Sequence, residues 1–181
     1  MKLSTRVAYG SLAALLALSA AIPASAQDSK SAPLARQLAA ALDAAKLDSI
    51  AAQDPDAPDV FVAALYFRGI QLLVVSGKYS VPQLLNTRLG NKEYRDVYMD
   101  LNGAATAKTF IEDPGADGLK PKRESNQPFD QAEMAGKRTM FDGEWKPQKM
   151  SEQDYMKAFA AADERYAQIL TALLAQLKKT S

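Results

Sequence analysis

VFVAALYF-RG-IQLLVV, residues 60–75, holds two strongly apolar runs separated only by Arg68 and Gly69. Both runs contain β-branched or aromatic residues, and a two-residue connection is typical of a tight β-hairpin. Polar residues scarcely interrupt either run, so the pattern predicts strands that are buried on both faces. We therefore expect this hairpin at the centre of a β-sheet.

The chain before and after the hairpin carries weaker patterns of both kinds. Apolar residues recur at helical spacing from Leu34 to Lys46, with Ser31 and Pro33 placed as a helix cap and a first-turn proline. Short strands are expected over residues 47–53, 94–101, 108–112 and 138–141, and a short inserted helix is expected from Ser80 to Gly90. Residues 113–137, which contain several prolines and glycines, indicate a long irregular loop.

The C-terminal segment, residues 151–179, has the clearest helical pattern. Ser151 and Asp154 are spaced as a capping pair at its start. Apolar residues then follow at alternating three- and four-residue steps, namely Tyr155, Phe159, Ala162, Tyr166, Ile169, Leu173 and Leu177. The stripe predicts one long amphipathic helix, which we expect to pack on the protein's own sheet rather than in a coiled coil.

Composition excludes several classes of chemistry. The 181 residues include no cysteine and no histidine, so disulfides, thiolate or imidazole metal ligands and a Ser-His-Asp triad are all absent. Proton transfer near neutral pH would need a carboxylate, lysine or tyrosine with a shifted pKa. The formal charge of +1 gives no reason to expect a nucleic-acid partner.

Residues 1–26 have the three parts of a secretory signal peptide. Lys2 and Arg6 provide a positive start, residues 12–22 are apolar, and Ala24-Ser25-Ala26 is a small-residue cleavage pattern. The apolar run is short for a membrane span, so we expect cleavage before Gln27 and no stable membrane insertion afterwards. The prediction is an exported protein, periplasmic or extracellular, whose residues 27–181 form a single domain.

Two acidic stretches deserve a test as cation sites. Residues 113–118, DPGADG, with Glu124 further on, have the outline of a calcium loop, but the third ligand position is Gly115. Residues 54–59, DPDAPD, place three aspartates around two prolines, which is the composition of an ordinary turn. We expect turn-rich loops at both places and predict no metal site.

The strongest candidate binding segment is Ser76-Gly77-Lys78-Tyr79-Ser80. It connects a predicted buried strand to a predicted helix, and a helix N-terminus presents backbone N–H groups that suit a phosphate. Ser76, Lys78 and Ser80 would add two hydroxyls and a cation. The simpler alternative is that Ser80 only caps the helix while Lys78 is solvated.

The order of these predicted elements over residues 47–112 resembles the flavin-mononucleotide-binding split-barrel superfamily, the fold of pyridoxamine-phosphate-oxidase-like proteins. In that family a strand ends in serine or threonine and runs through a basic loop into a helix, where the flavin phosphate is held. The resemblance implies that Ser76, Lys78 and Ser80 would be the phosphate-binding residues and that the cofactor would be flavin mononucleotide.

We therefore expect an α+β protein in which a small antiparallel split β-barrel carries an N-terminal helix, a short inserted helix and a long C-terminal helix. Two functions remain open. One is an exported, non-catalytic binding or interaction module, for which a second copy of the chain, forming a homodimer, is one candidate partner. The other is a flavin- or phosphate-ligand protein that uses Ser76, Lys78 and Ser80, with a reductase as one form of this alternative. No acid–base or nucleophile constellation in the sequence favours an enzyme.

Overall fold

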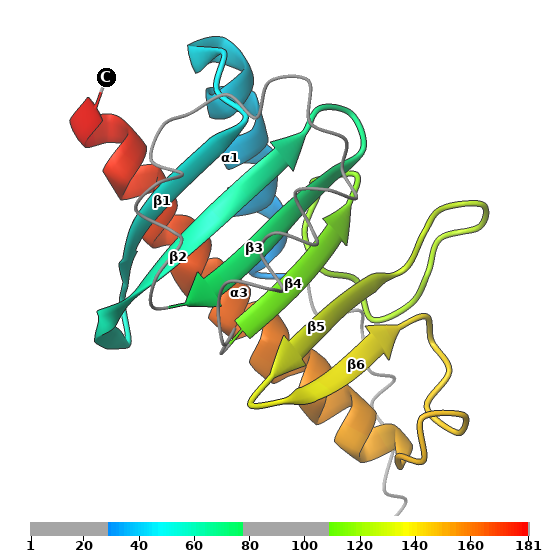
Figure 1. The fold of residues 1–181 in the computed structure, drawn as a ribbon. Helices are drawn as coiled ribbons and strands as arrows, with labels where there is room; N and C mark the ends of the chain where they lie inside the picture. Colours follow the sequence, from blue (N-terminus) through cyan, green and yellow to red (C-terminus); the bar gives the residue numbers. More distant parts are fainter. Residues whose placement is uncertain (1–28, 78–108, 181) are drawn as a thin grey trace, which may run out of the picture.

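The computed structural model describes residues 29–77 and 109–180 of the chain. In these residues it shows an α+β fold with two helices and six strands (Figure 1). The elements, in chain order, are α1 (Ser31–Ala45), β1 (Ser49–Asp54), β2 (Ala57–Phe67), β3 (Gln71–Gly77), β4 (Thr109–Pro114), β5 (Asp130–Met134), β6 (Lys137–Phe141) and α3 (Glu152–Thr180).

The six strands form one antiparallel sheet in which each strand pairs with the next one along the chain. The predicted hairpin is its β2–β3 pair, with Leu65 opposite Leu73 and Phe67 opposite Gln71. The sequence pattern predicts Ile70 as the first residue of the second strand. In the structure Ile70 belongs to the turn instead, where it is 66% exposed, and β3 begins at Gln71. Gly69 has φ +70°, a conformation that glycine adopts without strain.

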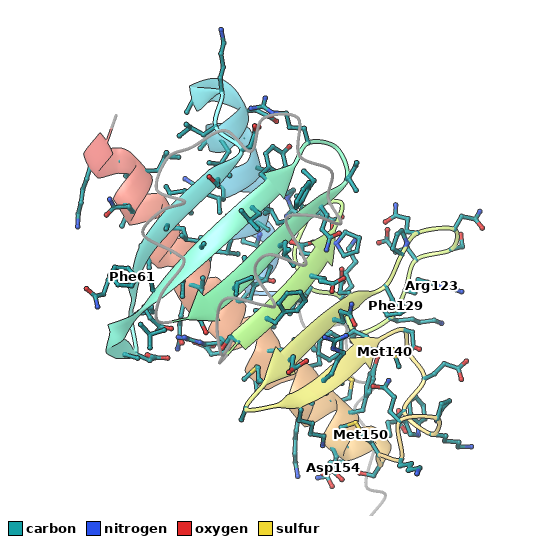
Figure 2. The ribbon with its side chains drawn as sticks, in the orientation of Figure 1. Phe61, Arg123, Phe129, Met140, Met150 and Asp154 are labelled. Atoms are coloured by element: carbon teal, nitrogen blue, oxygen red, sulfur yellow. The ribbon has the colours of Figure 1, made fainter. Side chains whose placement is uncertain are left out.

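The hairpin is buried on both faces, as its continuous apolar pattern predicted. Val62 and Val74 belong to the main core on the helix side, while Leu65 and Val75 on the opposite side are also almost fully buried. Within the described strands the sheet is open, with β1 and β6 as its two edges. Figure 2 shows Phe61 on β2 and Met140 on β6, towards opposite edges of the sheet.

Both helices cover the same face of the sheet. Helix α3 crosses behind all six strands, from β6 to β1, and α1 lies beside its second half (Figure 1). Every apolar residue of the predicted α3 stripe is buried, which confirms that the helix packs on its own sheet. Ser151 Oγ accepts a hydrogen bond from the Asp154 amide at 3.1 Å, which confirms the predicted cap; Figure 2 marks Asp154 in the first turn of α3.

The two helices run in the same direction. The start of α1 at Ser31 contacts Asp163 in the middle of α3, and Ala45 at the end of α1 lies near Leu177 at the end of α3. The start of the chain's first helix is thus fixed against a residue more than 130 positions away. This parallel pair positions both candidate sites described below.

Two predictions about local structure are wrong. Residues 113–137 are not one irregular loop, because they contain strand β5, in which Ala132 packs into the core while Gln131 and Glu133 face the other side. The polar and charged composition of β5 hid this alternation. Ser31 does not cap α1 with its side chain either, because the helix begins at Ser31 and no side chain of residue 30 caps it.

Several predicted features lie outside the described residues: the signal peptide at residues 1–26, the short helix that starts at Ser80, and the strand over residues 94–101. Among the helices that the structure describes, none combines the length and the hydropathy that a membrane crossing requires.

Candidate functional site

Ser76, the first residue of the predicted phosphate-binding segment, lies near the end of β3 and is fully buried. It shares a strand face with Leu72 and Val74, which is the face that the helices cover. Its hydroxyl has no hydrogen-bond partner among the described residues. Lys78 and Ser80 lie outside the described residues, so the segment as a whole stays a prediction.

The loop after β4 has a regular hydrogen-bond pattern. Four consecutive backbone amides, those of residues 117–120, each donate to a side-chain oxygen. The first two reach the Asp113 carboxylate at 3.1 and 2.9 Å, the third reaches Ser31 Oγ at 3.0 Å, and the fourth reaches Asp130 Oδ2 at 2.7 Å. Backbone turns of this kind make a concave group of amides that favours anions.

These hydrogen bonds show how the acidic residues that give residues 113–124 the outline of a calcium loop are used in the fold. The carboxylate of Asp113 is turned towards the loop's own amides, so it accepts hydrogen bonds instead of coordinating a cation. Glu124, at the twelfth position of the outline, pairs with Lys120 at 3.3 Å. In the part of the chain that the structure describes, no group of three or more acidic residues is arranged to hold a metal ion.

Asp113 is fully buried and is held from a second direction by α3. The Tyr166 hydroxyl, also fully buried, donates to Asp113 Oδ2 at 2.9 Å. Burial raises the pKa of Asp113 to about 6, although the hydrogen bonds from the Gly118 amide, the tyrosine and the Asp117 amide oppose that rise. Burial likewise raises the pKa of Tyr166 well above its usual value, so the phenol stays the donor.

Asp130, the first residue of β5, is the second buried carboxyl of this group, with 5% of its surface exposed. Burial is the main cause that raises its pKa to about 8, and the negative charge of Asp113 adds to the rise. The amide and the positive charge of Lys120 both oppose this rise but do not offset it. Near neutral pH the pair of carboxyls therefore favours one negative charge over two.

A third carboxylate, Asp163 on α3, fixes the start of α1. It accepts hydrogen bonds from the amides of Lys30 and Ser31 at 2.7 and 3.0 Å and from Ser29 Oγ at 2.6 Å. Asp163 thus takes the role of the helix cap that the sequence assigned to Ser31. The Ser31 hydroxyl is used elsewhere, on the Leu119 amide.

The aspartate-rich turn between β1 and β2 forms ion pairs with an arginine side chain of α3. Arg165 on α3 donates to Asp54 Oδ2 at 2.5 Å and to Asp56 Oδ2 at 2.6 Å, and Asp54 also accepts the amide of residue 56. The arginine and Asp54 are largely buried, with side chains 14% and 2% exposed. The predicted turn is observed at residues 55–56, whereas residues 57–59 already belong to β2, and Arg165 offsets part of the negative charge of the turn.

An open hollow of about 480 Å³ lies between the C-terminal ends of α1 and α3. Its lining is Gln37, Ala41, Ala44, Ala45, Leu174, Leu177 and Lys178. The two leucines are 8% and 7% exposed and form the apolar floor, while the alanines of α1 leave the space above them unfilled. Lys178 contributes the charged group of the lining.

These two places differ in what they can do chemically. The carboxyls of Asp113 and Asp130 have the shifted pKa values that acid–base catalysis needs, but both side chains are enclosed by the protein. The hollow is open, yet apart from Lys178 its lining holds no group that titrates. Catalysis requires contact between such groups and a substrate, and neither place provides both.

The sequence contained partial signals for the carboxylate group. The α3 stripe predicted a buried Tyr166, and a buried phenol needs a hydrogen-bond partner. The sequence does not reveal the role of Asp130, because the polar composition of residues 130–134 indicates a loop and not a strand. The hollow was missed because an alanine-rich helix face does not by itself reveal what packs against it.

No family model matches the chain, and no curated protein and no solved structure matches it either. The resemblance to flavin split barrels therefore stays a prediction from the sequence.

Proposed function

We propose that the chain is an exported, non-catalytic binding module whose ligand occupies the hollow between α1 and α3. The observation that carries this proposal is the hollow itself, which is open, has an apolar floor and lies within the size range of small-molecule sites. The enclosure of Asp113 and Asp130 supports the non-catalytic part, because a substrate cannot reach either carboxyl. Export rests on the pattern of residues 1–26.

The lining favours an amphiphile with one apolar chain and one anionic head. The alanines of α1, together with the small exposed parts of Leu174 and Leu177, provide apolar surface that a hydrocarbon chain would remove from water. Lys178, at the end of α3, provides a positive charge beside that surface, and Lys179 follows it. A carboxylate or phosphate head at Lys178 would complement this charge.

Calorimetric titration with three amphiphiles of equal chain length tests the proposal. Dodecanoate, dodecylamine and dodecanol, each below its micelle concentration, differ only in the head group. We expect dodecanoate to bind most tightly and dodecylamine least. Lys178→Gln should remove most of the preference for the carboxylate, whereas Lys179→Gln, one residue outside the hollow, should leave it.

A second pair of variants tests the location. Ala44→Phe places a ring in the hollow from an exposed position on α1 and should abolish binding. Ala40→Phe, exposed on the same helix but outside the hollow, is the matched control. Failure of all three amphiphiles to bind overturns the proposal. So does a dimer that Ala44→Phe dissociates, because the hollow would then be the contact surface of a homodimer.

The finer expectations on fold and cofactor remain predictions. A split barrel needs more than the open six-stranded sheet of the described residues, although consecutive antiparallel pairing is compatible with one. Flavin binding needs Lys78 and Ser80, and of its three residues only Ser76 is described, as a buried serine.

A further inference from the structure

We propose that Asp113 and Asp130 form a proton-controlled latch, which fastens the loop of residues 113–120 beneath the start of α1 while the pair holds a proton and loosens it when both carboxyls are ionised. This inference is independent of the proposed binding function. It rests on which groups face each carboxylate, on how deeply both are buried, and on what the loop contacts.

The Asp113 side of the latch is built for a negative charge. Its two oxygens accept three hydrogen bonds, from the amides of Asp117 and Gly118 and from Tyr166. Hydrogen bonds to an ionised carboxylate are stronger than those between neutral groups, so one charge is well accommodated at this place.

The Asp130 side is not built for a second charge. Its hydrogen bond with the loop is the one from the Lys120 amide at 2.7 Å. The Lys120 ammonium is directed elsewhere, to Asp117 at 2.6 Å and to Glu124 at 3.3 Å. A second ionised carboxylate at Asp130 would therefore lie buried and close to the charge on Asp113. In the part of the chain that the structure describes no cation pairs with Asp130 directly, and the charge of Lys120 lowers its pKa by less than burial and Asp113 raise it.

The other groups that face the pair do not supply that cation. From α3, the phenols of Tyr155 and Tyr166 face it, and each has a pKa that the charge of Asp130 helps to raise. Asp117 in the loop is itself acidic, and its charge helps to raise the pKa values of both carboxyls. Lys30, at the start of α1, pairs with Glu164 on the exposed side of α3. The surroundings of the pair thus favour one negative charge over two.

The loop transmits this charge state to α1. Its Leu119 amide donates to Ser31 Oγ, in the first turn of α1. Beside it, Gly118 lies so close to α1 that a Cβ atom there would be 2.2 Å from the Cα of Ala32. Movement of residues 117–120 away from the two carboxyls would break the hydrogen bond between the Leu119 amide and Ser31 and would separate Gly118 from Ala32.

Amide hydrogen exchange of residues 117–120 tests the latch in the full chain. Opening returns Asp130 to its ordinary pKa and releases its proton. Protection, corrected for the intrinsic exchange rate, should then fall about tenfold per pH unit between pH 6.5 and pH 8. Amides of β2, such as that of Leu65, should stay protected over this range.

Asp130→Asn is the decisive variant, because its side-chain oxygen can still accept the Lys120 amide but carries no charge. We expect its loop protection to be nearly constant from pH 6.5 to pH 8. Asp142→Asn is the matched control: Asp142 also accepts a backbone amide, that of Glu144 at 2.8 Å, but at an exposed place, and the slope of the wild type should persist.

A flat profile in the wild type overturns the latch, and so does a slope that survives in Asp130→Asn. If that variant does not fold, carboxyl carbon NMR of the wild type provides an independent test. A titration midpoint of Asp130 near 8 supports the latch, whereas a midpoint near 4 overturns it.

Discussion

Tyr166 on α3 donates its phenolic proton to Asp113 Oδ2 at the end of β4, across 2.9 Å, and neither residue has exposed surface. The contact joins the long helix to the sheet and to the loop that follows it. It also fixes the Asp113 carboxylate in the position where it accepts the backbone amides of Asp117 and Gly118. Its effect on stability should depend on pH, because the acceptor is a carboxyl that titrates.

Tyr166→Phe should lower the free energy of unfolding by about 1.5–3 kcal/mol at pH 8, where Asp113 is ionised and loses one of its donors. The loss should be smaller at pH 5, below the pKa of about 6. Urea unfolding at both pH values measures the difference. Tyr155→Phe is the control, because its hydroxyl donates to the neutral carbonyl of Pro121; an equal pH effect in both variants would contradict the prediction.

The free energy of unfolding of the wild type should fall as the pH rises from about 4 to about 8. Asp113 and Asp130 have folded-state pKa values of about 6 and about 8, above the ordinary value of 3.8. The folded protein therefore binds more protons than the unfolded chain in this window, so the two groups stabilise it fully below pH 4 and lose that effect as each raised pKa is passed. Denaturation midpoints across this range test the sign, which a rise in stability would refute.

Leu173→Ala should destabilise the protein by about 2–5 kcal/mol, because Leu173 is fully buried in the α3 stripe and truncation leaves a cavity. Thr171→Ala, two residues earlier on an exposed position, should have a much smaller effect. An unchanged denaturation midpoint for Leu173→Ala would mean that the stripe does not contribute to the core.

Mass spectrometry of protein recovered from an exporting host should find Gln27 as the first residue, because the cleavage pattern ends at Ala26. Replacing both Ala24 and Ala26 with arginine should block cleavage of the signal peptide, since the cleavage site requires small residues. An intact Met1 terminus in the membrane fraction would mean that residues 12–22 act as an anchor.

Lys78→Ala tests the flavin hypothesis. If residues 76–80 hold a phosphate, loss of one charge-assisted bond, about 1.5–3 kcal/mol, should weaken flavin mononucleotide binding by one to two decades. Riboflavin, which lacks the phosphate, should bind the wild type more weakly than flavin mononucleotide and should respond less to the variant. If neither compound binds the wild type at millimolar concentration, the segment is an ordinary connection.

Sequence patterns determined the elements whose signal is local. The continuous apolar runs of residues 60–75 predicted the β2–β3 hairpin, and the seven-residue stripe from Tyr155 to Leu177 predicted both the existence of α3 and its buried face. The cap at Ser151 was also predictable, because it involves residues three positions apart. Strand β5 was not, since the polar and charged residues Asp130, Gln131 and Glu133 weaken the apolar alternation on which strand prediction depends.

Tertiary structure alone decided the partners of the polar residues. From the sequence alone, an aspartate at position 113 could either coordinate a cation or accept hydrogen bonds from backbone amides. Only the path of the 113–120 loop shows that it accepts amides. Asp163 caps α1 from 132 positions away, and Arg165 on the same helix forms ion pairs with two aspartates of the β1–β2 turn. A hydrogen bond or an ion pair needs atoms within about 3 Å, and for residues this distant in sequence that proximity is set by the packing of α3 on the sheet.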